Sequence, residues 1–214
     1  MHRNPLRPIT LVDRPAYLAA LCAGKRVLHL GATDSPHTEE AFAGGRLLHL
    51  HLAAAAGELV GLDLDADRVA WLREQGIENI AIGNIENPAD YPGGLFDLIV
   101  AGEIFEHLDN PGRALDALRP CLGENARLVL SVPNAYSVKG FLRAVAGHEW
   151  IHPDHVLHHS QSTLRTLLGR HGFEPVEFFA YVNGGNGALA PLVNLALRAL
   201  PQLCEGVGVV ARPA

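Results

Sequence analysis

A short run of acidic and imidazole side chains, Glu103-Ile104-Phe105-Glu106-His107, follows an apolar stretch near the middle of the chain. If this run forms a helical turn, Glu103, Glu106 and His107 lie at i, i+3 and i+4 and share one face. Two carboxylates and an imidazole in that arrangement suit a divalent ion such as Mg²⁺, Mn²⁺ or Zn²⁺. The alternative is that Glu103 contacts a bound ligand, Glu106 caps a helix and His107 packs beneath it.

Histidines are concentrated further along the chain, where five of them lie between His148 and His159. Imidazole is the side chain that exchanges protons near neutral pH, so this segment is a candidate source of a general base. The predicted catalytic histidines are His155, His107 and His158. The predicted metal ligands are Glu103, Glu106, His107 and His155.

Alternating strand-like and helix-like patterns predict the elements that position these groups. The predicted strands are 26–30, 58–65, 79–83, 96–101, 127–132, 173–182 and 206–211. The predicted helices are 13–22, 46–56, 65–76, 110–123, 137–146, 161–171 and 191–200. Strands that alternate with helices predict an α/β fold, with a parallel sheet where each helix returns the chain in the same direction.

Four turns of this predicted sheet carry polar residues. In an open α/β sheet the ligand crevice lies beyond the carboxyl ends of the central strands. The turns after the first four strands are 31–34, 63–65, 83–86 and 101–103, and we expect them to line that crevice. A simpler interpretation is that Gly31 only makes a tight turn and that Asp63 only caps the next helix, although Asp65 and Asp67 suit that cap better.

The ordered set of turns resembles the class I S-adenosylmethionine-dependent methyltransferases from about Lys25 to the C-terminus, in particular the ubiquinone-pathway O-methyltransferase-like, methyltransferase type 11 group. The resemblance implies that the first turn wraps the methionine part of the cofactor, that Asp63 takes both ribose hydroxyls and that Asn84 meets the adenine amine. The cofactor-binding residues that it implies are Gly31, Ala32, Thr33, Asp63, Leu64, Asn84, Ile85 and Glu103. It also implies a Rossmann-like, seven-stranded sheet with helices on both faces, in the order 3-2-1-4-5-7-6 with strand 7 antiparallel.

The first turn departs from the usual pattern of that family. His29 stands where an acidic residue is usual, and Thr33 and Ser35 stand where glycines are usual. Hydroxyl groups of Thr33 or Ser35 can replace some of the missing contacts. A dinucleotide-binding dehydrogenase is disfavoured, because a GxGxxG sequence that would cradle a pyrophosphate is absent.

The resemblance also places a lid insertion, about 135–160, over the acceptor pocket. The predicted substrate-binding residues are Asn134, Tyr136 and His152. Alternatively, Asn134 satisfies local backbone groups and Tyr136 packs on the lid helix. The sequence at 103–107 with its downstream histidines is similar to that of ubiquinone-pathway O-methyltransferases and small-RNA 3′-terminal 2′-O-methyltransferases, in which a metal positions the acceptor hydroxyl.

These observations predict an enzyme that transfers a methyl group from S-adenosylmethionine to a hydroxyl of a small-molecule or sugar-containing acceptor. An N-methyltransferase and a non-catalytic partner protein with the same fold are the alternatives. The net charge of −6 over 214 residues disfavours a nucleic-acid partner. We expect one domain over residues 1–214, with an N-terminal helix at 13–22. We also expect no membrane span and a cytoplasmic location. The sequence does not determine the oligomeric state, and a homodimer is one of the alternatives.

Overall fold

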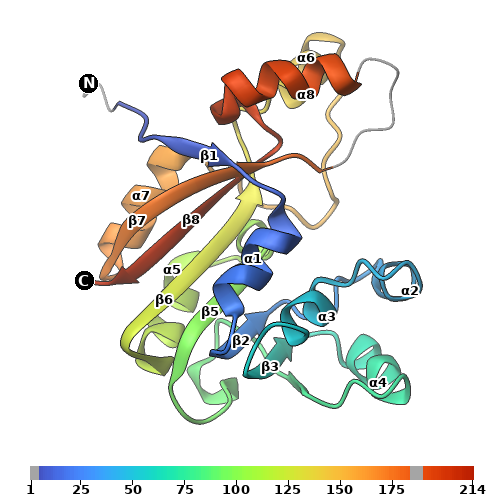
Figure 1. The fold of residues 1–214 in the computed structure, drawn as a ribbon, viewed down its shortest axis with the longest axis vertical. Coiled ribbons are helices and arrows are strands. Elements are labelled where there is room, and N and C mark those ends of the chain that lie inside the picture. The colour runs from blue at the N-terminus through green and yellow to red at the C-terminus, as the bar shows by residue number, and fades with distance from the viewer. Residues whose placement is uncertain (1–4, 184–189) are drawn as a thin grey trace.

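The computed structural model describes residues 5–183 and 190–214, and its centre is an eight-stranded sheet (Figure 1). The strand order is β1-β7-β8-β6-β5-β2-β3-β4. The strands are β1 (Ile9–Leu11), β2 (Arg26–Leu30), β3 (Glu58–Asp63), β4 (Ile80–Ile82), β5 (Phe96–Gly102), β6 (Leu122–Pro133), β7 (Phe173–Tyr181) and β8 (Gly206–Pro213). The α-helices are α1 (Arg14–Cys22), α2 (Thr38–Ala43), α3 (Leu48–Ala53), α4 (Ala66–Glu74), α5 (Pro111–Leu118), α6 (Val138–Val145), α7 (Gln161–Arg170) and α8 (Ala190–Ala199).

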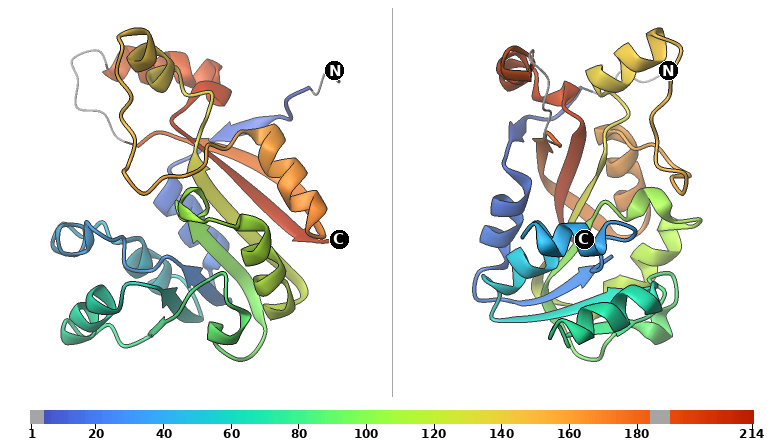
Figure 2. Two further views of the ribbon diagram at one scale, coloured as in Figure 1. Left: turned by 180° about the vertical axis from the view of Figure 1, so that it is seen from behind. Right: turned by 90° about the vertical axis from the view of Figure 1, so that its right-hand side faces the viewer.

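The predicted fold class is confirmed. Strands β2 to β8 follow the predicted order, and β8 runs antiparallel to both β6 and β7 while the other pairs are parallel. The central strands β2 and β5 are apolar runs because helices cover both of their faces. Figures 1 and 2 show α1 and α3 on one face of the sheet and α5 and α7 on the other.

The structure corrects the predicted elements in three places, of which the first is an eighth strand in a sheet predicted to have seven. The strand β1, which pairs in parallel with β7 at the sheet edge, has three half-exposed or exposed residues, and a run that short carries no alternating pattern. The predicted helix at 46–56 is shorter, α3, and is preceded by the unpredicted α2. The predicted strand at 127–132 begins earlier, at Leu122, so Gly123 lies in β6 rather than ending a helix.

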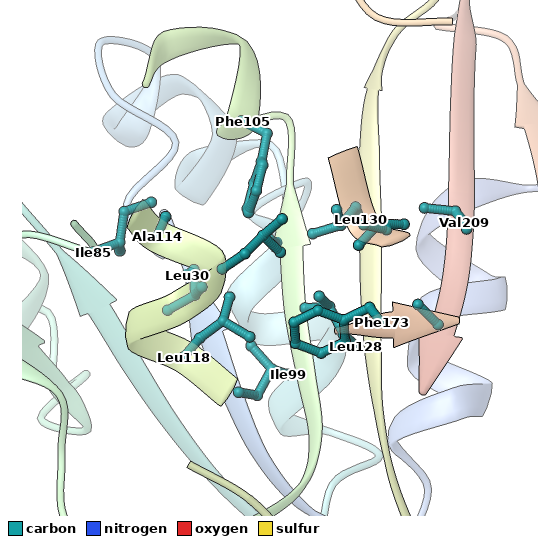
Figure 3. Packing of buried hydrophobic residues seen from close by; sticks show 14 of the residues in the cluster. Leu30, Ile85, Ile99, Phe105, Ala114, Leu118, Leu128, Leu130, Phe173 and Val209 are labelled. Atoms are coloured by element: carbon teal, nitrogen blue, oxygen red, sulfur yellow. The ribbon is translucent and has the colours of Figure 1, made fainter. Parts of the chain in front are cut away.

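The larger core lies between one face of the sheet and the helices α5 and α7 that cover it. Asn110 caps α5, and Pro111 occupies the first turn, where its missing N–H costs nothing. Apolar residues of α5 belong to the same buried cluster as residues of β6 and β7, among them Leu118, Leu128 and Phe173 (Figure 3). This packing fixes the carboxyl ends of the central strands, where the predicted crevice lies. Within the described part of the chain, the helices are all too short or too polar to cross a membrane.

Candidate functional site

A cavity of about 360 Å³ lies where β2, β3 and β5 end, and we call it the strand-end cavity. Its walls come from the turn after β2, the end of β3, the segment after β5, helix α1 and the histidine-rich segment. The lining includes Arg14, His29, Gly31, Ala32, Thr33, Asp34, Asp63, Gly102, Glu103, His107, His152 and Asp154. The elements thus converge at the edge of the sheet that the sequence indicated.

Asp63, the last residue of β3, holds the first turn in place. Its carboxylate accepts hydrogen bonds from the backbone N–H of Thr33 at 2.8 Å and of Asp65 at 3.0 Å. Asp65, rather than Asp63, caps α4, because it accepts from the N–H of Arg68. The carboxylate of Asp63 therefore lies in the cavity wall as an acceptor, and the interpretation that it serves as a helix cap is wrong.

Gly31 is required by the backbone and by its neighbour. Its φ is +72°, in the left-handed region, and a Cβ there would lie 3.1 Å from Cδ1 of Ile104. The hydroxyl of Thr33 is buried and has no partner among the described residues, whereas Ser35 donates to Asp65 at 2.8 Å. Of the two hydroxyls predicted to compensate for missing glycines, only that of Thr33 is uncommitted in the structure.

Arg14 of α1 is a cavity residue that the sequence reading missed. Its Nε donates to Ser131 at 3.0 Å, and its Nη1 lies 3.4 Å from a carboxylate oxygen of Glu103. A Cβ on Gly102 would lie 2.5 Å from Nη2, so only glycine lets this guanidinium cross the end of β5. The pairing spans 89 positions of the sequence, and no local pattern signals it.

Glu103 does not share a helical face with Glu106 and His107, so that prediction is wrong. Its φ of +54° precedes a single 3-10 turn, Phe105–His107, instead of a longer helix. The carboxylate of Glu103 also accepts from Tyr181 at 3.0 Å and from Asn183 at 3.1 Å. Burial, followed by the charge of Glu103, raises the pKa of Tyr181 well above its ordinary value, so this phenol remains a donor.

Glu106 is buried, and neither of its carboxylate oxygens has a hydrogen-bond partner among the described residues. Burial raises the pKa of this carboxyl to about 8. Its backbone carbonyl accepts from the N–H groups of Val156 and Leu157, at 2.9 and 3.2 Å. These two bonds fix the histidine-rich segment directly against the turn after β5.

Three imidazoles meet above this turn, and we call His107, His152 and His155 the histidine cluster. One nitrogen from each lies within 4.8 Å of the other two, and Nε2 of His155 is 4.0 Å from Glu106. Burial, together with the neighbouring imidazoles, lowers the pKa of His107 and His155. Neutral imidazoles beside a buried carboxyl can accept a proton or bind a divalent ion.

A second, larger cavity of about 1100 Å³ lies between α6, the segment after it and the residues before β8, and we call it the apolar cavity. Val138, Phe141, Trp150, Ile151 and Leu203 are among its lining residues. The segment 149–158 contributes to both cavities, through Trp150 and Ile151 to this one and through His152 and Asp154 to the other. Of the histidine cluster, His107 and His152 line the strand-end cavity, and His155 lines neither cavity.

The predicted site residues divide between these places. Gly31, Ala32, Thr33, Asp63, Glu103, His107 and His152 line the strand-end cavity. Asn134, Tyr136 and His158 line the apolar cavity. Leu64 is exposed, Asn84 accepts from the N–H of Glu86 at 2.8 Å, and Ile85 lies in the core beside Ala114 (Figure 3).

Asn134 has most of its hydrogen-bonding capacity used within the protein. Its amide nitrogen donates to the carbonyls of Gln202 and Cys204, both at 2.9 Å, and its oxygen accepts from the N–H of Tyr136 at 3.0 Å. The side chain therefore ties the end of β6 to the segment before β8. Contact with an acceptor remains a prediction for Asn134, and Tyr136, which is exposed, has more free surface for it.

The strand order, the antiparallel β8 and the crevice with an acidic residue at the end of β3 define a class I S-adenosylmethionine-dependent methyltransferase fold. A family described as a methyltransferase domain matches residues 10–177. The chain belongs to this family.

Curated relatives are similar to this chain in sequence, and solved structures share its fold. The ubiquinone biosynthesis O-methyltransferase of Cronobacter sakazakii is 28% identical over 157 residues, which is 71% of this chain and 58% of that protein. The chain thus spans a little over half the length of this relative. Magnesium protoporphyrin IX methyltransferase from Synechocystis PCC 6803 has a TM-score of 0.59 at 15% identity, covering 94% of this chain and 80% of that one. The [4+2]-cyclase SpnF has a TM-score of 0.62 at 16% identity, and the match covers 94% of this chain and 79% of that one.

Proposed function

We propose that this chain transfers the methyl group of S-adenosylmethionine to a hydroxyl group of a small-molecule or sugar-containing acceptor. The observation that carries the proposal is the histidine cluster, which lies beside Glu106 and contributes His107 and His152 to the wall of the strand-end cavity. An acceptor amine that is already neutral needs no such base, whereas a hydroxyl must lose a proton as it is methylated. The similarity to an O-methyltransferase supports the same choice.

The strand-end cavity is the proposed cofactor site. Asp63 offers a carboxylate to the ribose hydroxyls, since each of its oxygens can accept more than the one backbone bond it already has. Arg14 offers a guanidinium to the carboxylate of the cofactor's amino-acid part. The remaining predicted contacts, through Leu64, Asn84 and Ile85, concern the adenine end and lie outside the cavity's lining.

The apolar cavity is the proposed acceptor site. Its aromatic and aliphatic walls favour an acceptor that carries an apolar part beside its hydroxyl. The segment 135–160 would act as the lid that excludes water. Tyr136 would contact the acceptor from within this cavity, and His152 would contact it from the strand-end cavity, which it lines. Methyl transfer from a sulfonium depends mainly on alignment of the acceptor oxygen with the methyl group, which such a closed site provides.

His155 is our first candidate for the base that takes the hydroxyl proton, followed by His107. Both rings belong to the cluster, and the lowered pKa of each leaves a neutral ring with a free lone pair. His158, the third candidate, lies on the apolar cavity and is 3.8 Å from Glu149 instead. His158→Ala tests whether it acts from that side.

The cluster also fits a divalent ion. Three imidazoles with converging nitrogens and a buried carboxyl without partners form a donor set that suits Zn²⁺ or Mn²⁺ better than Mg²⁺, which prefers oxygen. His152 would replace Glu103 in the predicted ligand set, because the carboxylate of Glu103 is occupied by Arg14, Tyr181 and Asn183. A bound ion would supply Lewis-acid stabilisation of the acceptor oxygen.

Methyl-labelled S-adenosylmethionine and paired acceptors test the proposal. Each pair differs only in a hydroxyl or an amine on the same aromatic or sugar framework. We expect label on the hydroxyl member, and a larger yield for frameworks with an apolar part. Label confined to the amines would replace the proposal with N-methylation. Binding of S-adenosylhomocysteine without transfer to any pair would favour a non-catalytic partner, and absence of binding would contradict both.

A further inference from the structure

Two histidines and an asparagine form a buried chain that ends at the strand-end cavity. His29 of β2 and His49 of α3 are 1% and 0% exposed, and their Nδ1 atoms are 3.2 Å apart. The Nε2 of His49 lies 3.2 Å from Oδ1 of Asn79. A Cβ on Gly61 would lie 3.0 Å from the ring of His49, so β3 has a glycine where this ring packs.

The protonation of the chain follows from Asn79. Its amide nitrogen donates to the carbonyl of Leu59 at 2.8 Å, which orients Oδ1 toward His49. An amide oxygen only accepts, so His49 must be protonated on Nε2 and, as a neutral ring, has its lone pair on Nδ1. The bond between the two rings then requires a proton on Nδ1 of His29. Nε2 of His29 is left as a bare acceptor.

That acceptor has no hydrogen-bond partner among the described residues, although it is buried. The ring of His29 lines the strand-end cavity. Burial lowers its pKa well below the ordinary value, and the nearby His49 and Arg14 lower it further. Buried polar atoms are nearly always satisfied, by protein, water or ligand. The arrangement therefore points to a donor that enters from the cavity.

We propose that Nε2 of His29 accepts a hydrogen bond from the ammonium group of the bound cofactor, and that His49 and Asn79 are positioning residues that keep Nε2 unprotonated. The inference rests on the proposed cofactor site. The cavity has Arg14 for a carboxylate and Glu103 as a nearby negative charge, so a zwitterionic amino-acid group finds complementary partners there. A neutral acceptor at His29 adds directionality without adding a further negative charge.

Nitrogen NMR of the wild-type protein tests the protonation directly. With ¹⁵N-labelled histidine, we expect His29 to be a neutral ring protonated on Nδ1 and His49 a neutral ring protonated on Nε2. Addition of S-adenosylhomocysteine should shift the Nε2 resonance of His29 and leave that of exposed His51 in place. A His29 ring protonated on Nε2 would overturn the inference without affecting the proposed function.

Calorimetry with two ligands tests the contact. S-Adenosylhomocysteine carries the ammonium group, whereas 5′-methylthioadenosine has the same nucleoside and sulfur but lacks the amino-acid part. We expect His29→Phe to weaken the binding of S-adenosylhomocysteine by about tenfold or more, which is the usual effect of losing a charge-assisted hydrogen bond. The affinity for 5′-methylthioadenosine should change by less than about twofold. Asn79→Leu, which frees the tautomer, should give a smaller loss for S-adenosylhomocysteine alone.

The matched control is His51→Phe, because His51 lies on the same helix as His49 but is exposed and bonds only to the carbonyl of Gly45. We expect it to bind both ligands as the wild type does. Equal weakening of both ligands by His29→Phe, or no weakening of either, would reject the contact. Failure of the wild type to bind S-adenosylhomocysteine would instead reject the cofactor site itself.

Discussion

At the scale of residues, the neighbouring carboxyls Glu103 and Glu106 show how a short turn separates two roles. Glu103, at positive φ, has three side-chain donors, whereas Glu106 is buried with none among the described residues. Their spacing in the sequence suggested equal roles as metal ligands. Long-range partners, and not the spacing, make the difference between them.

We therefore expect Glu106→Gln and Glu103→Gln to differ in metal affinity. Glu106→Gln removes a carboxylate beside the histidine cluster and should weaken Mn²⁺ or Zn²⁺ binding by about tenfold or more. Glu103→Gln should change it by less than about threefold, because that carboxylate serves Arg14 and Tyr181. Calorimetric titration of the metal alone measures both. A larger loss in Glu103→Gln would restore the ligand set predicted from the sequence.

Asp63 and His155 should separate cofactor binding from turnover. Asp63→Asn should weaken the binding of S-adenosylhomocysteine and of 5′-methylthioadenosine equally, by about tenfold or more. Both ligands contain the ribose, and the variant loses the charged acceptor that the ribose hydroxyls would contact. His155→Ala should leave both affinities within about twofold and lower the rate of methyl transfer by about a hundredfold. If both variants lost cofactor affinity equally, this division of the site would be rejected.

At the scale of elements, the long and buried segments were predictable, and two of the short ones, α2 and β1, were not. Strand β5 and helix α5 have unmistakable patterns, and Ala114, Leu115 and Leu118 are buried as expected. Helix α2 has only six residues, and β1 has only three. Such segments form because neighbouring elements already provide partners for them, as β7 does for β1. Their stability is tertiary, so the local sequence does not predict it.

The turn after β2 depends on glycine for two separable reasons, which a pair of variants can measure. Gly31→Ala should lower the free energy of unfolding by about 2 kcal/mol or more, from the left-handed backbone and from crowding against Ile104. Gly45→Ala has a similar φ of +63° but no atom within 4 Å, so it should lose about 1 kcal/mol from the backbone alone. Urea unfolding compares them.

Ile104→Val provides the control for crowding, since it removes the Cδ1 atom that lies 3.1 Å from the added Cβ. In the Ile104→Val background, Gly31→Ala should lose less stability than in the wild type but still more than Gly45→Ala, because Cγ1 and Cβ of the side chain remain 3.3 and 3.4 Å from the added Cβ. An unchanged difference between the two glycine variants would show that the contact with Cδ1 of Ile104 contributes nothing.

At the scale of the whole molecule, the site joins segments that only the fold brings together. The order of turns after the strands was visible in the sequence, and it located Gly31, Asp63 and Glu103 at the cavity. The Arg14–Glu103 pair, the approach of His152 to His107 and His155, and the His29–His49 chain were not visible in the sequence. Each depends on side chains from separate elements that meet across the sheet end, for which no local periodicity exists.

Stability should depend on pH through these buried imidazoles. Burial lowers the pKa of His29 and His49 in the folded protein, whereas the unfolded chain has the ordinary value near 6.5. Below that pH the unfolded state binds protons that the folded state does not, so this contribution to stability falls as the pH falls. For each histidine that stays neutral when folded, the loss between pH 7.5 and 5.5 is about 1.4 kcal/mol.

The double variant His29→Phe/His49→Leu isolates this contribution. Asp34 and Glu106 have raised pKa values and act in the opposite direction, since the folded state binds their protons first. His107, His155 and His159, with lowered pKa values, add to the loss. All five residues remain in the variant, so their contributions cancel in the difference between wild type and variant.

We expect urea unfolding at pH 7.5 and 5.5 to show a smaller acid-induced loss of unfolding free energy in the double variant than in the wild type. The loss in His51→Gln should equal that of the wild type. Equal losses of unfolding free energy in wild type and double variant would mean that His29 and His49 take up protons within the folded protein. That result would contradict the chain of tautomers from Asn79 to His29.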